Sequence, residues 1–177
     1  MKIEEHRLDV AKFIASPNFD QRPIEEEISL IVIHNISLPP NQFGGPHIES
    51  LFCNKLNPDD HPYFQNIHQL KVSAHLLIRR NGEIIQFVDF NQRAWHAGKS
   101  SYRGKERVND FSIGIELEGS DFTPFEEKQY EVLNSVLTCL QNHYPKLNSE
   151  SITGHSDIAP ERKTDPGPHF DWAKITR

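Results

Sequence analysis

The chain has 177 residues, of which 36% are hydrophobic and 25% are charged, and its formal net charge is −6 with neutral histidines. This length predicts a single domain over residues 1–177, with a core at about residues 28–172, and the apolar content excludes an intrinsically disordered chain. The acidic balance disfavours nucleic acid as a partner. No apolar run approaches the roughly 20 residues that span a bilayer, so no membrane partner is expected.

The N-terminal segment mixes acidic and basic residues and has neither an apolar core nor a small-residue cleavage site. This composition is not that of a secretory signal peptide, and we therefore expect a cytoplasmic protein. Residues 1–27 are interpreted as a polar lead-in with a turn around Pro17 and Pro23. Two cysteines, Cys53 and Cys139, are too few for a disulfide framework.

The first strong element is residues 29–34, a short continuous apolar run rich in β-branched residues that predicts a buried strand. Residues 35–71 are dense in proline and glycine, which predicts irregular backbone with one short helix from Pro46 to about Lys55. A loop region of this length inside a compact domain is usually functional.

Residues 73–79 and 84–89 predict a hairpin of two strands, because Asn81-Gly82 between apolar runs is a strong turn signal. Residues 111–118 predict a further strand. Side chains alternate along such a strand, so Ser112, Gly114 and Glu116 are expected on the face opposite Ile113 and Ile115.

A helix is predicted after residues 123–126, which form a capping box with Pro124 at the first helical position. Its apolar stripe comprises Leu133, Val136, Leu137 and Leu140, and it should end before Pro145. Residues 151–155 predict a short last strand before a proline-rich tail. The predicted fold class is α/β (α+β): a single domain with a mixed central sheet flanked by helices.

Two histidines stand at the ends of predicted strands, His34 and His155, and Asp165 follows ten residues after the second. Strand ends that open onto loops are common ligand positions, and two imidazoles with one carboxylate form a catalytic zinc set with a vacant fourth position. The alternative is that each histidine caps or packs a strand end. Spacing along the chain gives no distance between them.

Glu116 lies mid-strand, in phase with Gly114, and Glu118 shares that phase. Either acid is a candidate general base. The alternative for both is a solvent-facing acid on a half-exposed sheet, and for Lys163 it is an ordinary surface lysine.

Five segments together resemble the AmpD family, the 1,6-anhydro-N-acetylmuramyl-L-alanine amidases, which belong to the type 2 amidase superfamily with the peptidoglycan-recognition proteins. They cover most of residues 30–172 in family order. The segments are IVIHNISLPP, QFGGPHIESLF, VSAHLLIRRNGEIIQ, RAWHAGKSSYRGKERVNDFSIGIELEG and ITGHSDIAPERKTDPGPHFDW. The resemblance points to the cytoplasmic recycling branch of that superfamily.

The resemblance implies one zinc ion held by His34, His155 and Asp165, with Glu116 rather than Glu118 as the catalytic acid. It also implies that Lys163 stabilises the oxyanion of the tetrahedral intermediate. Positions implied near the substrate are Asn35, Lys71, Trp95, His96 and Arg107. The resemblance further puts His75 on the same sheet surface.

The implied reaction is hydrolysis of the amide bond between the lactyl group of anhydro-N-acetylmuramic acid and the L-alanine of the stem peptide. The implied partner is a small soluble anhydro-muropeptide, and the protein is expected to be a monomer. Position 71 is lysine where arginine is more usual, which weakens a bidentate grip on a peptide carboxylate. The alternative function is a non-catalytic muropeptide-binding domain, which typically lacks part of the metal set.

Overall fold

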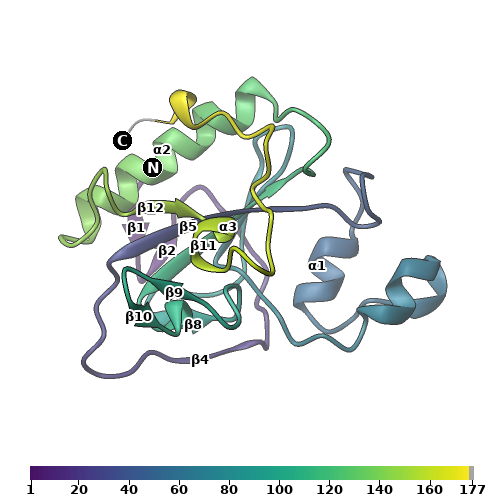
Figure 1. The fold of residues 1–177 in the computed structure, drawn as a ribbon, viewed down its shortest axis with the longest axis horizontal. Helices are drawn as coiled ribbons and strands as arrows, with labels where there is room; N and C mark the ends of the chain where they lie inside the picture. Colours follow the sequence, from purple (N-terminus) through teal and green to yellow (C-terminus); the bar gives the residue numbers. More distant parts are fainter. Residues whose placement is uncertain (176–177) are drawn as a thin grey trace.

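A computed structural model describes residues 1–175 of the chain. Its centre is a six-stranded mixed sheet with the strand order β12-β5-β11-β6-β7-β3 (Figure 1). The neighbours β12, β5, β11 and β6 run parallel, β6 and β7 are antiparallel, and β3 pairs parallel with β7. Three further pairs, β1-β2, β4-β8 and β9-β10, form small antiparallel sheets outside it.

The strands are β1 (Ile3–Glu4), β2 (Arg7–Leu8), β3 (Lys12–Phe13), β4 (Phe19–Gln21), β5 (Leu30–Ile36), β6 (Leu76–Ile78), β7 (Ile84–Gln86), β8 (Gln92–Ala94), β9 (Ser101–Tyr102), β10 (Lys105–Glu106), β11 (Ser112–Glu118) and β12 (Ile152–Gly154). The helices are α1 (His47–Phe52), α2 (Glu127–His143) and α3 (His155–Ile158), with 3₁₀ turns at Pro58–Asp60, Pro62–Asn66, Val108–Asp110 and Trp172–Lys174.

The two faces of the central sheet have different cover. The long helix α2, green in Figure 1, packs its buried stripe against Ile113, Ile115 and Leu117 of β11. A second apolar cluster joins α1 to Leu77 and Ile85 on the sheet. Because side chains alternate along β11, the face away from α2 carries its polar residues, and that face holds the site. None of the described helices has the length and apolar character needed to cross a membrane.

The main sequence predictions are confirmed. The predicted strands at 29–34, 111–118 and 151–155 correspond to β5, β11 and β12, and the hairpin corresponds to β6 and β7. The turn residue Gly82 has a φ of +87°, a backbone conformation that favours glycine. The short helix predicted from Pro46 is α1.

Two predictions at element ends are wrong. Residues 1–27 are more than a lead-in, because they contain β1 to β4 and supply the edge strand β3; strands of two or three residues are too short to show alternation. The predicted capping box at residues 123–126 is also wrong. The helix cap is Glu126, whose side chain accepts from the backbone of Gln129, while Thr123 bridges to Ser120 and Phe125 is buried on Gly119.

Candidate active site

The parallel strands bring the predicted ligands to one edge of the sheet. In the β5-β11 register Glu116 lies beside His34, and in the β12-β5 register Gly154, which precedes His155, lies beside Ile33. Parallel strands end at the same edge of a sheet, so residues 121 apart in the sequence become neighbours. His155 itself is the first residue of α3 rather than the last of a strand.

Three ligand atoms converge at this edge. The Nδ1 atoms of His34 and His155 are 2.9 Å apart, and each is 3.0 Å from Oδ2 of Asp165. Among residues 1–175 this is the one group of three or more histidine, cysteine or carboxylate side chains whose ligand atoms all lie within 4.8 Å of one another. The fold therefore brings the side chains of His34, His155 and Asp165 together.

The chemistry of these donors fits a divalent cation. Nε2 of His155 lies 3.1 Å from the carbonyl oxygen of Ala97, which can only accept, so Nε2 carries the proton and Nδ1 presents a lone pair. Burial lowers the pKa of His34 to about 4 and keeps it neutral. Burial raises the pKa of Asp165, but its contacts with the two imidazoles outweigh burial and lower it, so Asp165 is a carboxylate. Two nitrogens and one oxygen of this kind form a three-ligand zinc set.

Glu116 lies beside this group and is 9% exposed. Its Oε2 is buried without a hydrogen-bond partner in the structure. Burial raises the pKa of Glu116 well above its usual value, and the charge of Asp165 raises it further, while Lys163 lowers it. A carboxyl group with a raised pKa in a cleft is a candidate for general acid–base catalysis.

Glu118 shares the strand face of Glu116 but is fully engaged. Its Oε1 accepts from Nη1 of Arg79 at 2.6 Å and from the backbone N of Gly44 at 2.6 Å, and its Oε2 accepts from the backbone N of Arg80 at 3.2 Å. Arg79 also binds Glu49 of α1. This buried ion network ties the 37–46 loop and α1 to the sheet, so Glu118 is structural.

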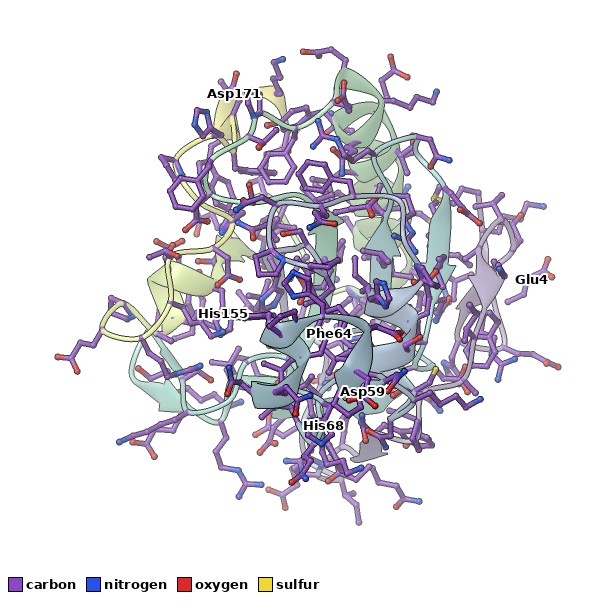
Figure 2. The ribbon with its side chains drawn as sticks, turned by 90° about the vertical axis from the view of Figure 1, so that its right-hand side faces the viewer. Glu4, Asp59, Phe64, His68, His155 and Asp171 are labelled. Carbon is purple, nitrogen blue, oxygen red and sulfur yellow. The ribbon has the colours of Figure 1, made fainter. Side chains whose placement is uncertain are left out.

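The ligand group opens into a cleft of about 530 Å³. One side is apolar and includes Tyr63, Ile67 and Leu70 from the segment around the 3₁₀ turns. Figure 2 looks onto this segment, with Phe64 and His68 toward the viewer and His155 to one side. Phe122, which is 79% exposed, also lines the cleft. The cleft therefore pairs a polar floor with apolar walls, as expected for a ligand that is part apolar and part charged.

The structure places the predicted substrate residues in different surroundings. Asn35 and Trp95 line the cleft, as does Lys163, which was predicted to be catalytic. Nδ2 of Asn35 donates to Oδ1 of Asp121 at 2.7 Å and to the carbonyl oxygen of Pro166 at 3.0 Å, so Asn35 holds the loop that carries Asp165. Its side chain is thus a brace for the ligand loop as well as a cleft residue.

The other three predicted substrate residues each have a different position relative to the cleft. His96 borders the cleft from behind His34, with its Nδ1 3.0 Å from Nε2 of His34. Lys71 is exposed and is not among the cleft residues. Arg107 lines a separate groove, where its Nε pairs with Asp110 at 3.0 Å.

The cleft residues that the sequence reasoning missed include Asp121, Phe122 and Arg162. Arg162 lies next to Lys163 in the APERKTDPGP segment, which was the available signal. Its Nη2 donates to the carbonyl oxygens of Ala97 and Lys99. Nothing in the pattern around Phe122 distinguishes a cleft residue from any other exposed aromatic residue.

His75 has a structural part in this region. It is completely buried, and its Nδ1 accepts from the backbone N of Gly114 at 3.0 Å while its Nε2 faces the carbonyl oxygen of Gln92 at 3.1 Å. Burial, and then the charge of Arg22, lower the pKa of His75 to about 3. The ring therefore stays neutral and bridges β11 to the first residue of β8, Gln92.

We expect this burial to make stability depend on pH. An unfolded histidine takes up a proton near pH 6.5, whereas folded His75 resists protonation down to about pH 3, so its contribution is complete above pH 6.5 and is lost as the pH falls toward 3. In metal-free protein, His75→Asn should flatten the fall in unfolding free energy by up to about 1.4 kcal/mol per pH unit. Urea unfolding at several pH values measures this; His143→Asn, at an exposed position, is the control. Parallel curves for His75→Asn and wild type would contradict it.

Comparison with known proteins agrees with this site. The profile of the N-acetylmuramoyl-L-alanine amidase family, Amidase_2, matches residues 24–168. The chain is 56% identical over 175 residues to the 1,6-anhydro-N-acetylmuramyl-L-alanine amidase AmpD of Citrobacter freundii, covering 99% of this chain and 93% of that protein. It is 54% identical to AmpD of Escherichia coli strain K12, covering 99% and 95%.

Solved structures give the same result. The fold matches a crystal structure of a selenomethionine derivative of AmpD with a TM-score of 0.96 and 54% identity, covering 99% of this chain and 100% of that one. It also matches the E. coli amidase AmiD in complex with the substrate anhydro-N-acetylmuramic acid-L-Ala-D-gamma-Glu-L-Lys, with a TM-score of 0.61 and 30% identity, covering 87% of this chain and 59% of that one. The chain therefore belongs to the N-acetylmuramoyl-L-alanine amidase family of amide hydrolases.

Proposed function

We propose that this chain is a zinc-dependent amidase. It cleaves the amide bond between the lactyl group of 1,6-anhydro-N-acetylmuramic acid and the L-alanine of the stem peptide, in the cytoplasmic recycling of cell-wall fragments. One observation carries the proposal: three ligand atoms of His34, His155 and Asp165 converge in an open cleft beside the buried carboxyl group of Glu116, whose Oε2 has no hydrogen-bond partner among residues 1–175.

His34, His155 and Asp165 would hold the zinc ion, because each directs one ligand atom to the same point. Zinc in such a site supplies Lewis acidity, which makes water acidic near neutral pH and polarises a carbonyl group. Ala97 supports the ligand His155 through its carbonyl oxygen, and Asn35 supports the loop of Asp165.

Glu116 accepts the proton of the attacking water and then delivers it to the departing alanine nitrogen. Its raised pKa favours the second step, since the carboxyl group holds the proton more tightly than an exposed glutamate would until the amine departs. Lys163 borders the same cleft and is positioned to stabilise the oxyanion that forms on the lactyl carbonyl.

The substrate is a small soluble muropeptide and the protein acts as a monomer. The apolar wall and Phe122 suit the sugar and its lactyl methyl group, and Arg162 and Lys163 provide positive charge for peptide carboxylates. AmiD, 30% identical to this chain, is bound to an anhydromuropeptide substrate in its complex. A non-catalytic binding domain would not require a buried acid beside the ligand group.

We expect chelation to abolish turnover and zinc to restore it. Purified protein is incubated with an anhydro-muropeptide, with the matched muropeptide that lacks the anhydro bridge, and with intact sacculi, and the released peptide is measured by mass spectrometry. Zinc is quantified in the same samples. Loss of more than nine-tenths of the turnover after metal removal, with recovery at one zinc per chain, is the expected result.

Two outcomes would oppose the proposal. Full turnover in metal-free protein would remove zinc from the mechanism. Tight binding of the muropeptide without release of peptide, by zinc-loaded protein, would identify a binding domain instead of an enzyme.

A further inference from the structure

His96, which also lines the cleft, is part of a series of hydrogen bonds that ends at the ligand His34. Its Nδ1 is 3.0 Å from Nε2 of His34, and the two rings meet edge-on with centroids 5.1 Å apart. Its Nε2 is 3.2 Å from Oγ of Ser112, and that hydroxyl donates to the carbonyl oxygen of Val108 at 2.7 Å. Both nitrogens of His96 are therefore engaged.

The carbonyl group of Val108, at the far end of this series, fixes which atom donates and which accepts in each hydrogen bond. Val108 offers a carbonyl oxygen that can only accept, so the single proton of Ser112 is committed to it. The Ser112 oxygen must then accept from Nε2 of His96, and a neutral imidazole with a proton on Nε2 has a lone pair on Nδ1. Each ring nitrogen of His96 thus has one partner, an acceptor at Nε2 and a donor at Nδ1, which matches the single proton of a neutral imidazole. Nδ1 of His96 can accept only from a protonated Nε2 of His34.

We infer that His96 is a positioning residue: through the relay Val108–Ser112–His96 it fixes His34 in the tautomer that leaves Nδ1 free to bind the metal. This inference rests on the proposed zinc function.

The contacts around His96 hold its ring and backbone in place for this role. A Cβ atom on Gly114 would lie 2.4 Å from the His96 ring, so only glycine at this point of β11 lets the ring lie flat against the strand. The backbone N atoms of His96 and Ala97 both donate to Oδ1 of Asn109, at 3.2 and 2.8 Å.

The carbonyl oxygen of Ala97 in turn accepts a hydrogen bond from Nε2 of His155. Residues 96–97 therefore serve both histidine ligands: one through a side chain, the other through a backbone carbonyl. Outer partners of this kind fix the tautomer and orientation of metal-binding histidines, and their loss typically weakens metal affinity 10- to 100-fold.

Three variants separate the relay from simple packing. His96→Leu removes the acceptor and should weaken zinc binding about 10- to 100-fold. His96→Asn retains an oxygen acceptor near the position of Nδ1 and should stay within about 3-fold of wild type, well inside the loss expected when an outer partner is removed. Ser112→Ala leaves Nε2 of His96 without an acceptor, which favours the opposite tautomer, and it should weaken zinc binding although Ser112 touches no ligand.

The measurements are the zinc dissociation constant, by chelator competition, and the imidazole tautomers in metal-free protein, by ¹⁵N NMR at neutral pH. Wild type should show His34 protonated on Nε2, and Ser112→Ala should shift His34 toward the Nδ1 form. Thermal unfolding checks that each variant is folded. If His96→Leu does not fold, the Ser112→Ala affinity and the wild-type tautomer still decide the question.

Wild-type zinc affinity in both His96→Leu and Ser112→Ala, or a proton on Nδ1 of His34 in the metal-free wild type, would overturn the inference. Failure of the proposed function looks different, because the wild type would then bind no zinc or would turn over without it. The tautomer measurement needs no metal and separates the two cases.

Discussion

Glu116→Gln is expected to reduce turnover at least 100-fold while zinc remains bound at one ion per chain. Loss of a positioned general acid–base group typically reduces rates 10²- to 10⁴-fold. Glutamine has nearly the same shape but cannot take or release the proton, and Glu116 is not among the converging ligand atoms. Because Oε2 of Glu116 has no partner in the fold, the variant should unfold at a temperature no lower than wild type.

Glu118→Gln is the matched control, since it lies on the same face of the same strand two residues further on. Removing one charge from its buried pair with Arg79 should destabilise the protein by about 3–5 kcal/mol, while turnover per folded molecule stays near wild type. The two variants thus separate chemistry from stability. Near-normal turnover in Glu116→Gln, measured with zinc present, would remove Glu116 from the proposed mechanism.

The fold was predictable where elements are long and regularly patterned. Local sequence patterns were enough to predict three elements: the apolar run at 29–34, the hairpin turn at Asn81-Gly82 and the apolar stripe on α2. The short N-terminal strands were not predictable, because two residues cannot show a period and their pairing depends on distant partners such as Ile85. The start of α2 was misplaced because Phe125 is held in the core before the helix begins.

The ligand set was predictable as a list but not as a geometry. The residues alone left His34, His155 and Asp165 as separate candidates; the resemblance joined them, and the parallel register of β12, β5 and β11 explains why they meet. The same register resolves Glu116 from Glu118, which periodicity could not do, because only the latter has Arg79 opposite it.

Outer positions were the hardest to predict. We expected His96, Lys71 and Arg107 near the substrate. His96 lines the cleft and also contacts the ligand His34, whereas Lys71 and Arg107 are not among the cleft residues. Such distinctions depend on which way a loop side chain turns, and for His96 that is decided by a tertiary partner, His34, rather than by local sequence.

Asp165→Ala is expected to abolish tight zinc binding. Removing a direct ligand should weaken affinity by more than the 10- to 100-fold typical of an outer partner, since two imidazoles alone do not complete a three-ligand site. Competition with a chelator measures the affinity. Thermal unfolding with and without zinc gives a second reading, because a ligand at 100 times its dissociation constant stabilises a folded protein by about 2.7 kcal/mol. Wild type should gain this stabilisation and Asp165→Ala should not.

Asp171→Ala is the control from the same C-terminal segment. Asp171 caps the last 3₁₀ turn by accepting from the backbone N of Ala173, and it lies far from His155 in Figure 2. This variant should bind zinc as wild type does, although its tail is less stable. If Asp165→Ala kept one zinc per chain at wild-type affinity, the three side chains would be neighbours without being a metal site. The close approach of their ligand atoms, which lie 2.9 to 3.0 Å apart, would then need another explanation.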